Sequence, residues 1–280
     1  MIGRIPARAA LLAVAALLAV AVFGVTAGAA DAESEVVYSN LPETNPGNVV
    51  SEAFEATSTD QFGGLVQLGG TARRNGAVTV GLSSWGCEHG GWPGTPECTT
   101  AMGARFSLPV TLNIYEAGPS NEVGALLRSV TKTFNIPYRP SENDKKCTGE
   151  AHGAWYDGAL HQCFHGKYTK ITFAVGKFTW PAKAIVSIAF NTSDYGASPQ
   201  RPQPCNSEPN GGCPYDSLNV GLTEETGPSV GSDPAPAGVY QDSKWTGAYC
   251  DNGIGGTGVF RLNDGCWTGY QPLIRVKATI

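Results

Sequence analysis

The sequence predicts an all-β protein, built as a two-sheet antiparallel sandwich of jelly-roll type with long disulfide-stapled loops. The first observation is composition: the 280 residues include 36 glycines and 19 prolines, and only 15% of them are charged. The second is that apolar and polar residues alternate with the period of two that is typical of strands with one buried face. The third is that no segment sustains the helical period, whereas turn residues separate about ten short apolar stretches.

Residues 1–30 carry the pattern of a secretory signal peptide. Arg4 and Arg8 precede an apolar run over residues 9–25, and the small residues Ala-Gly-Ala follow at 27–29. Such a segment directs export and is then removed. The alternative is an uncleaved membrane anchor, because the run is only slightly shorter than a spanning helix. We expect a secreted, extracellular protein whose mature form does not span the membrane.

The rest of the chain is interpreted as an extended N-terminal arm over residues 31–60 and a single β-sandwich domain over residues 61–280. Pro42 and Pro46 lie among Asn and Gly residues in the arm, and this composition excludes a long helix there. In the domain, alternation predicts successive strands, which lie within residues 62–68, 78–85, 106–115, 126–136, 171–175, 186–190 and 274–280.

Two stretches have the clearest strand pattern. In residues 106–114 the apolar positions alternate with Ser107, Pro109, Thr111 and Asn113. Because proline cannot donate to a strand ladder, we expect an edge or a bulge at Pro109. Residues 214–222 alternate in the same way and are flanked by turn formers on both sides. We therefore expect a late, central strand whose partners come from far earlier in the chain.

Eight cysteines predict a disulfide framework. An even number in an exported chain is consistent with complete pairing in an oxidising compartment. The cysteines fall into four sequential couples, and each couple encloses a loop rich in Gly, Pro or Asn. Pairing between neighbours is the simplest arrangement, which joins Cys87 to Cys98, Cys147 to Cys163, Cys205 to Cys213, and Cys250 to Cys266. Loops this short are stabilised by about 2 to 3 kcal/mol each when they are closed.

Metal binding is the alternative use of some of these residues. Zinc ligands would come from the cluster of Cys147, His152, His161, Cys163 and His165, although its spacing matches no known finger. Calcium is a separate candidate, because carboxylate and amide oxygens are its ligands and several occur near the end of the chain, at Asp251, Asn252, Asn263 and Asp264.

Residues 61–73, 78–85, 106–115 and 215–220 together resemble a group of secreted β-sandwich proteins from high-GC Gram-positive bacteria. The same stretches are distantly similar to sandwich domains of anchored bacterial surface proteins. The likeness covers most of the mature chain. It implies the fold and export, and it transfers no catalytic residue because the group has no established activity. This chain departs from the anchored relatives in ending on a strand pattern at residues 273–280.

Catalytic motifs give little support for an enzyme. Neither a Gly-x-Ser-x-Gly elbow nor a His-Glu-x-x-His motif occurs. Paired carboxylates could still hydrolyse glycans, with candidates at Asp157, Asp194, Asp216 and Glu116. Asp216 is the most notable because it lies at the entry to the predicted central strand, where a carboxylate needs hydrogen bonds. Its alternative role is to cap a turn.

Aromatic residues in and around the cysteine loops are the better functional hint. Exposed aromatic planes on rigid loops can stack on sugar rings. The candidates for a glycan site are Trp85, Trp92, Trp155, Tyr156, Trp245, Trp267 and Tyr270, together with Asp216. The alternative is that these rings cover the disulfides as small satellite cores.

Charge argues against nucleic acid as a partner. Without Arg4 and Arg8 the mature chain has 17 basic against 24 acidic residues, a net charge of about −7, and it shows no basic stripe. We therefore predict a non-catalytic extracellular or cell-envelope-associated binding protein, with glycan as the leading ligand class. The alternatives are a secreted hydrolase that acts on polysaccharide, and a structural or interaction protein with no small ligand.

Overall fold

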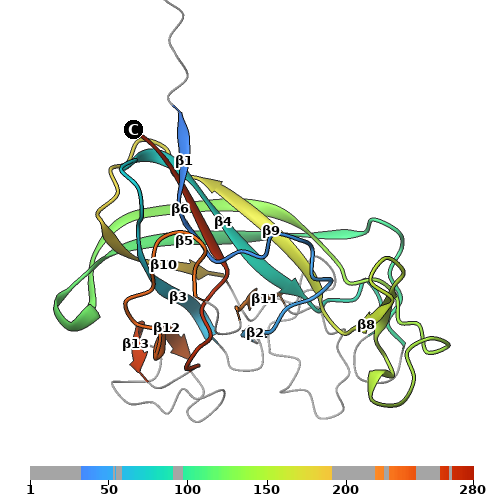
Figure 1. Ribbon diagram of the computed structural model, residues 1–280. Coiled ribbons are helices and arrows are strands. Elements are labelled where there is room, and N and C mark those ends of the chain that lie inside the picture. Colours follow the sequence, from blue (N-terminus) through green and yellow to red (C-terminus); the bar gives the residue numbers. More distant parts are fainter. Residues whose placement is uncertain are drawn as a thin grey trace, which may run out of the picture. The chain divides into compact units, whose positions relative to one another are not determined.

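The computed structural model describes residues 33–52, 54, 59–90, 97–190, 218–223, 227–243, 259–264 and 267–280. In these residues the strands form two six-stranded sheets and one two-stranded hairpin, and every strand pair is antiparallel (Figure 1). The predicted all-β class is therefore confirmed. The predicted signal peptide lies outside the described residues. In the described ranges we find no helix with the length and apolar character needed to span a bilayer.

Each sheet combines strands from distant parts of the chain. Sheet A has the order β1 (Ser34–Ser39), β14 (Ile274–Thr279), β4 (Arg74–Ser84), β11 (Leu218–Gly221) and β2 (Ser51–Glu52), and β9 (Lys167–Ala174) also pairs with β4. Sheet B has the order β13 (Arg261–Asp264), β12 (Gly238–Ser243), β3 (Thr59–Gln67), β10 (Lys183–Ala189), β5 (Arg105–Ala117) and β6 (Val123–Pro137).

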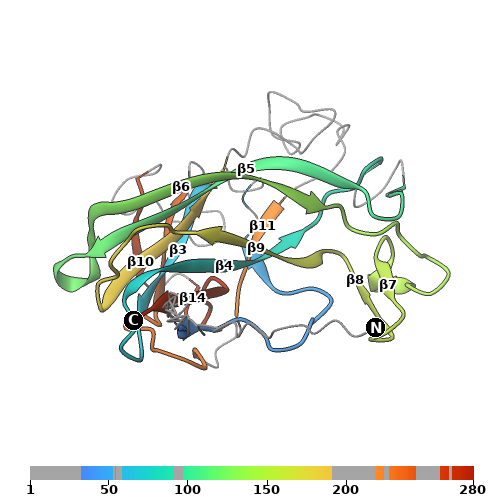
Figure 2. The same ribbon diagram turned by 90° about the horizontal axis from the view of Figure 1, so that it is seen from above.

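The remaining elements are short. A hairpin joins β7 (Trp155–Asp157) to β8 (Gln162–Phe164), and two single 3₁₀ turns are η1 (Pro119–Asn121) and η2 (Gly149–Ala151). In Figures 1 and 2 this hairpin lies beside the end of β9, at the end of the long β5–β6 pair opposite its hairpin turn.

Sheet A is curled into a half-barrel around β4. One edge of β4 pairs with β9 from Ala77 to Ser84, so the other edge takes β14 and β11 in succession. Leu273, just before β14, donates its N–H to the carbonyl of Gly221 in β11 at 2.8 Å. The two strands therefore continue one another along β4.

The two sheets bury their apolar faces in one shared core. Val80 of β4, Leu112 of β5 and Val186 of β10 are fully buried members of this single cluster. At the margin, Phe134 of β6 meets Phe173 of β9 edge to face, with ring centroids 4.9 Å apart. Because burying one such side chain contributes about 1.5 to 3 kcal/mol, this core is the main source of stability.

β5 has the two faces that its alternation predicts. Phe106, Leu108, Val110, Leu112 and Ile114 are all buried in the shared core. Pro109 lies on the other face, opposite Thr133 of β6. The pairing of β10 with β5 reaches only Thr111, so Pro109 lies beyond that ladder and local edge geometry is confirmed there.

The late strand pattern is also confirmed as β11. Leu218 and Val220 enter the core, and Asn219 on the opposite face is 2% exposed. β11 pairs with β4 on one side and with β2, within the predicted arm, on the other. β1, the first strand of the arm, forms the edge of sheet A beside β14. Both strands lie within residues 31–60, and the boundary between arm and domain stays a prediction.

Candidate functional site

Two of the predicted disulfides are confirmed. Cys87 is bonded to Cys98 and Cys147 to Cys163, with Cα–Cα separations of 5.6 and 5.8 Å. The predicted pairs of Cys205 with Cys213 and of Cys250 with Cys266 lie outside the described residues.

The two cysteines of the suggested zinc cluster, Cys147 and Cys163, are therefore bonded to each other, and neither offers a thiolate. His152 instead lies 3.2 Å from a carboxylate oxygen of Asp144. Of the suggested calcium ligands, Asn263 lies on β13 and is buried, while residues 251 and 252 and the side chain of Asp264 are outside the described part. A calcium site remains a prediction.

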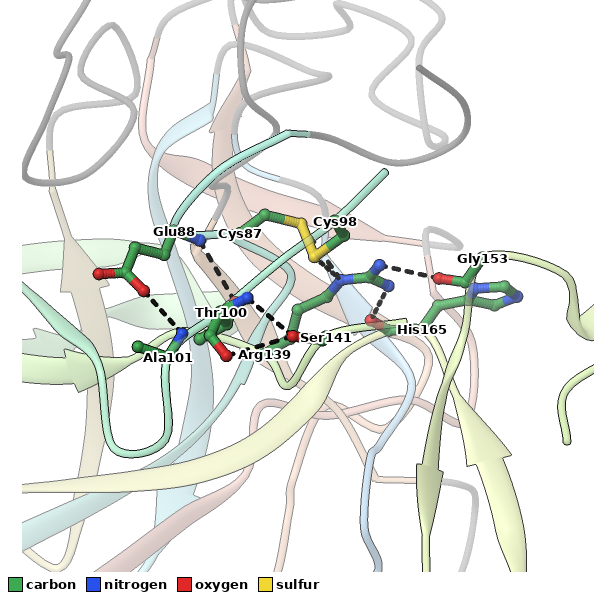
Figure 3. The surroundings of a disulfide bond; sticks show 9 residues. All are labelled: Cys87, Glu88, Cys98, Thr100, Ala101, Arg139, Ser141, Gly153 and His165. Atoms are coloured by element: carbon green, nitrogen blue, oxygen red, sulfur yellow. Dashed lines mark hydrogen bonds between the residues drawn. A yellow bond between two sulfur atoms is a disulfide. The ribbon is translucent and has the colours of Figure 1, made fainter. Parts of the chain in front are cut away.

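The first disulfide surrounds a completely buried arginine that the sequence pattern did not reveal (Figure 3). Arg139 donates from Nε to Cys98 Sγ at 3.1 Å and to Cys87 Sγ at 3.4 Å. Its two terminal nitrogens donate to the carbonyls of His165 at 2.9 Å and Gly153 at 2.8 Å. Arg139 thus ties the first disulfide to the loop closed by the second.

Burial controls the electrostatics of this cluster. It lowers the pKa of Arg139 to about 10, and the negative charge of Glu142 opposes that shift. The guanidinium therefore stays protonated at neutral pH. Burial also lowers the pKa of His165, and the positive charge of Arg139 lowers it further. His165 is accordingly neutral near pH 7, and its ring stacks on Trp85 with centroids 6.0 Å apart.

The candidate aromatic residues near these two disulfides pack within the protein. Trp155 is 6% exposed and donates its indole N–H to the carbonyl of Gly166 at 2.8 Å. The ammonium of Lys146 lies 4.0 Å from the ring centroid of Tyr156. Trp85 has one face on His165. Trp155 therefore has no open face for stacking on a sugar.

Some of the remaining candidate residues pack against the core, and others lie outside the described residues. Trp267 and Tyr270 are partly buried against the shared core, and their two rings meet edge to face with centroids 6.0 Å apart. Trp92, Trp245 and Asp216 lie outside the described residues. Of the other carboxylates, Asp157 accepts the N–H groups of Ala159 and Leu160 and so caps a turn. Glu116 lies on β5 at its exposed end.

A different surface has the regular chemistry of a binding site. The outer face of β5 and β6 carries uncharged side chains in four opposed pairs, which we call the polar row: Ser107 with Asn135, Pro109 with Thr133, Thr111 with Thr131, and Asn113 with Ser129. Successive pairs are about 6.8 Å apart because each residue of a strand rises about 3.4 Å.

Hydrogen bonds across the strands orient the polar row. Ser107 Oγ donates to Asn135 Oδ1 at 2.8 Å, and Ser129 Oγ donates to Asn113 Oδ1 at 2.7 Å. The hydroxyls of Thr111 and Thr131 are 2.8 Å apart. Each hydroxyl has one donor and two acceptor positions, so a bond to its neighbour leaves further positions open to a ligand.

The polar row continues onto the next strands of sheet B. Gln61 of β3 donates to Tyr115 Oη at 2.9 Å and to Ser187 Oγ at 2.7 Å. Gly63 lies opposite Ser187, where an added Cβ would come within 2.6 Å of the serine Cβ. The missing side chain at Gly63 therefore allows this close approach of β3 and β10.

The outer face of sheet A differs in charge. Thr79 of β4 and Thr172 of β9 form a similar hydroxyl pair at 2.9 Å. However, Arg275 lies opposite Thr79 on the other side, and Lys170 lies opposite Gly81 two residues along. This threonine pair therefore lies among cations, whereas the eight residues of the polar row are uncharged. One cation borders the row: Arg105, two residues before Ser107 on β5, donates to the carbonyl of Asn135 at 3.0 Å.

Comparisons with known proteins found no matching family model, no matching curated protein and no matching solved structure.

The sequence pattern indicates only the β5 half of the polar row. Alternation indicates that Ser107, Thr111 and Asn113 share a face, but it does not reveal which residues of β6 lie opposite them. That information is in the register of β5 and β6, which lie side by side along their length in Figure 2.

Proposed function

We propose that the protein is a secreted, non-catalytic binding protein for neutral polysaccharide, located outside the cell or at the cell envelope, and that the polar row is its contact surface. The observation that carries this proposal is the uncharged, register-matched arrangement of hydroxyl and amide groups on β5 and β6. The export pattern of residues 1–30 and the two disulfides support an oxidising, extracellular environment.

The chemistry of the row suits a polymer that is rich in hydroxyl groups. Such a ligand needs many moderate hydrogen bonds rather than one strong charge, because each net bond contributes only about 0.5 to 1.5 kcal/mol. A repeated row meets that need along an extended chain. The absence of charge in the row disfavours ionic polymers and leaves neutral glycans as the matching class.

Binding to polysaccharides tests the proposal. Oxidised mature protein is incubated with a panel of insoluble neutral polysaccharides and analysed by affinity electrophoresis in soluble ones. Thr131→Val removes one hydroxyl of the row while keeping a β-branched side chain, and it should weaken binding by about two- to tenfold. Thr172→Val is the matched control, since it removes the equivalent hydroxyl from sheet A and should leave binding unchanged.

The outcomes separate ligand class from location. Wild-type protein that binds no neutral polysaccharide would remove the ligand assignment. Binding that Thr131→Val leaves intact, or that Thr172→Val weakens equally, would exclude the polar row as the site.

We also interpret the two sheets as a sandwich of jelly-roll type and the chain as a relative of secreted Gram-positive sandwich proteins.

A further inference from the structure

A small cavity beside β1 contains an acidic group with an unmet hydrogen-bonding requirement. The cavity has a volume of about 300 Å³. Its described lining comes from the end of β1 and the residue after it, from Thr223 after β11, from residues 227–236, and from the segment that precedes β14. Tyr38, Asn40, Asp233 and Gln271 are its main polar residues.

Asp233 is the unusual member of this set. Its Oδ1 accepts the N–H of Ala235 at 2.9 Å, and its Oδ2 is buried with no hydrogen-bond partner among the described residues. Burial raises the pKa of Asp233 to about 6. The described lining contains no Lys, Arg or His to balance the carboxylate. A buried acceptor without a donor costs about 1 to 3 kcal/mol, and more when it is charged.

Tyr38 is the second available group. It is 2% exposed, and its hydroxyl makes no hydrogen bond within the described part of the chain. Burial and the charge of Asp233 raise the pKa of Tyr38, so it remains a neutral hydroxyl that can donate or accept. The electrostatic coupling of Tyr38 to Asp233 is consistent with their lining the same cavity.

The two amide side chains of the cavity are already used by the fold. Asn40 donates to the carbonyl of Pro272 at 2.9 Å and accepts the N–H of Ile274 at 2.6 Å. Gln271 donates to the carbonyl of Gly238 at 3.0 Å. They hold the wall in place, which leaves the Asp233 oxygen and the Tyr38 hydroxyl for a ligand.

A second pocket adjoins this cavity, and its lining includes Glu43 and Asn48 besides apolar residues. It has a volume of about 430 Å³ and shares Asn40, Thr223 and Gly227 with the cavity. Its apolar lining consists of Leu41, Pro42, Pro46, Val49, Val50, Leu222 and Leu273. A ligand with a polar end in the first space would therefore have room for an apolar body in the second.

We propose that the paired cavity is a binding site for a small primary ammonium compound with an apolar body. The ammonium group donates to Asp233 Oδ2 and to Tyr38 Oη, and the apolar body lies against Leu222 and Leu273. An ammonium group supplies three donors and one positive charge, which are the features that the cavity lacks. A divalent metal fits poorly, because calcium takes six to eight oxygen ligands and the described lining of the cavity has one carboxylate.

This proposal is independent of the polysaccharide surface, since the two sites share no residue. A negative result at one site therefore leaves the other unaffected. Under the two proposals the cavity binds a cationic ligand, whereas the polar row binds a neutral one.

Calorimetric titration with four probes at pH 7.5 tests the ligand class. Hexylammonium should bind, whereas hexanol, hexanoate and methylammonium should each bind at least about tenfold more weakly, because each lacks the charge, the correct sign of charge or the apolar body. Hexanol that binds as well as hexylammonium would show an apolar pocket only. Failure of hexylammonium to bind at millimolar concentration would overturn the proposal.

Two variants test the location. Asp233→Asn keeps an acceptor for Ala235 but removes the charge, and Tyr38→Phe removes only the hydroxyl. Asp233→Asn should weaken hexylammonium binding at least about tenfold, and Tyr38→Phe about two- to tenfold. Glu122→Gln, an exposed carboxylate change, is the control and should alter nothing. Unchanged affinity in both cavity variants, with a cooperative melting transition, would place the ammonium elsewhere and overturn the site.

Discussion

Arg139, which is fully buried, and Asp233, which is partly buried, have opposite surroundings. Arg139 is fully buried, and each of its three guanidinium nitrogens donates to an acceptor in the first disulfide or in a backbone carbonyl. Asp233 has one oxygen bonded to the backbone, and its other oxygen is buried with no donor in the part of the chain that the structure describes. A buried cation whose three nitrogens all donate to the fold stabilises the scaffold, whereas a carboxylate oxygen that the described residues leave without a donor can accept a hydrogen bond from a ligand.

The same comparison predicts opposite signs for removing the two charges. Loss of Arg139 would leave several acceptors without donors, so the free energy of unfolding should decrease. Loss of the Asp233 charge would remove a desolvation cost, so the free energy of unfolding should increase.

Replacing Arg139 should have the largest effect. Arg139→Met fills a similar length but leaves the carbonyls of Gly153 and His165 without donors, and should lower the free energy of unfolding by about 3 to 5 kcal/mol. Arg139→Lys keeps the charge without the planar fork and should lose less. Urea denaturation measures both. A loss below about 1 kcal/mol for Arg139→Met would show that the cluster is not structural.

The disulfide that closes the shorter loop, Cys87–Cys98, should contribute more to the free energy of unfolding than Cys147–Cys163. They close sequence separations of 11 and 16 residues, so chain entropy alone makes the second slightly more stabilising, each contributing about 2 to 4 kcal/mol. However, Cys87 and Cys98 also accept from Arg139. We expect the Cys87→Ser/Cys98→Ser double variant to lose more stability in urea than Cys147→Ser/Cys163→Ser. The reverse order would mean that these sulfurs are poor acceptors.

Removing the charge of Asp233 should stabilise the protein in a pH-dependent way. Because burial raises the folded pKa from 3.8 to about 6, ionisation costs stability as pH rises through that interval. Asp233→Asn should therefore raise the free energy of unfolding by about 1 to 2 kcal/mol at pH 7.5, after allowance for partial exposure, and by nothing below about pH 4. The titratable groups coupled to it, Tyr38 and Tyr240, stay neutral over this range.

Thermal unfolding of wild type and Asp233→Asn across pH 3.5 to 8 measures that difference. A constant offset at all pH values would mean that the effect is packing rather than ionisation. A loss of stability at pH 7.5 would mean that the carboxylate already has a donor.

The smallest effect is expected at Glu142, which opposes the pKa shift of Arg139 from a partly exposed position. Glu142→Gln should cost less than about 1 kcal/mol, because exposed ion pairs contribute little and salt screens them. The same urea titration at low and high salt checks this. A loss comparable to that of Arg139→Met would show that Arg139 depends on a charge partner rather than on its neutral acceptors.

Sequence reasoning was most successful where the signal is local. The two faces of β5, the strand at residues 218–221 and the pairs Cys87–Cys98 and Cys147–Cys163 all follow from spacing over a few residues. It was less successful for side-chain roles: the interpretation of Trp155 as a stacking platform is inconsistent with its burial. An aromatic residue beside a disulfide has the same sequence pattern whether it points outward or inward.

The sequence by itself determined that strands bury the apolar residues and that neighbouring cysteines close short loops, because alternation and loop closure act over short separations. Only the tertiary structure decided that Arg139 is buried, that Thr131 lies opposite Thr111, and that Tyr38 and Asp233 line one cavity although almost two hundred residues separate them. These relations depend on strand register and on desolvation within the complete fold, and neither leaves a periodic trace in the chain.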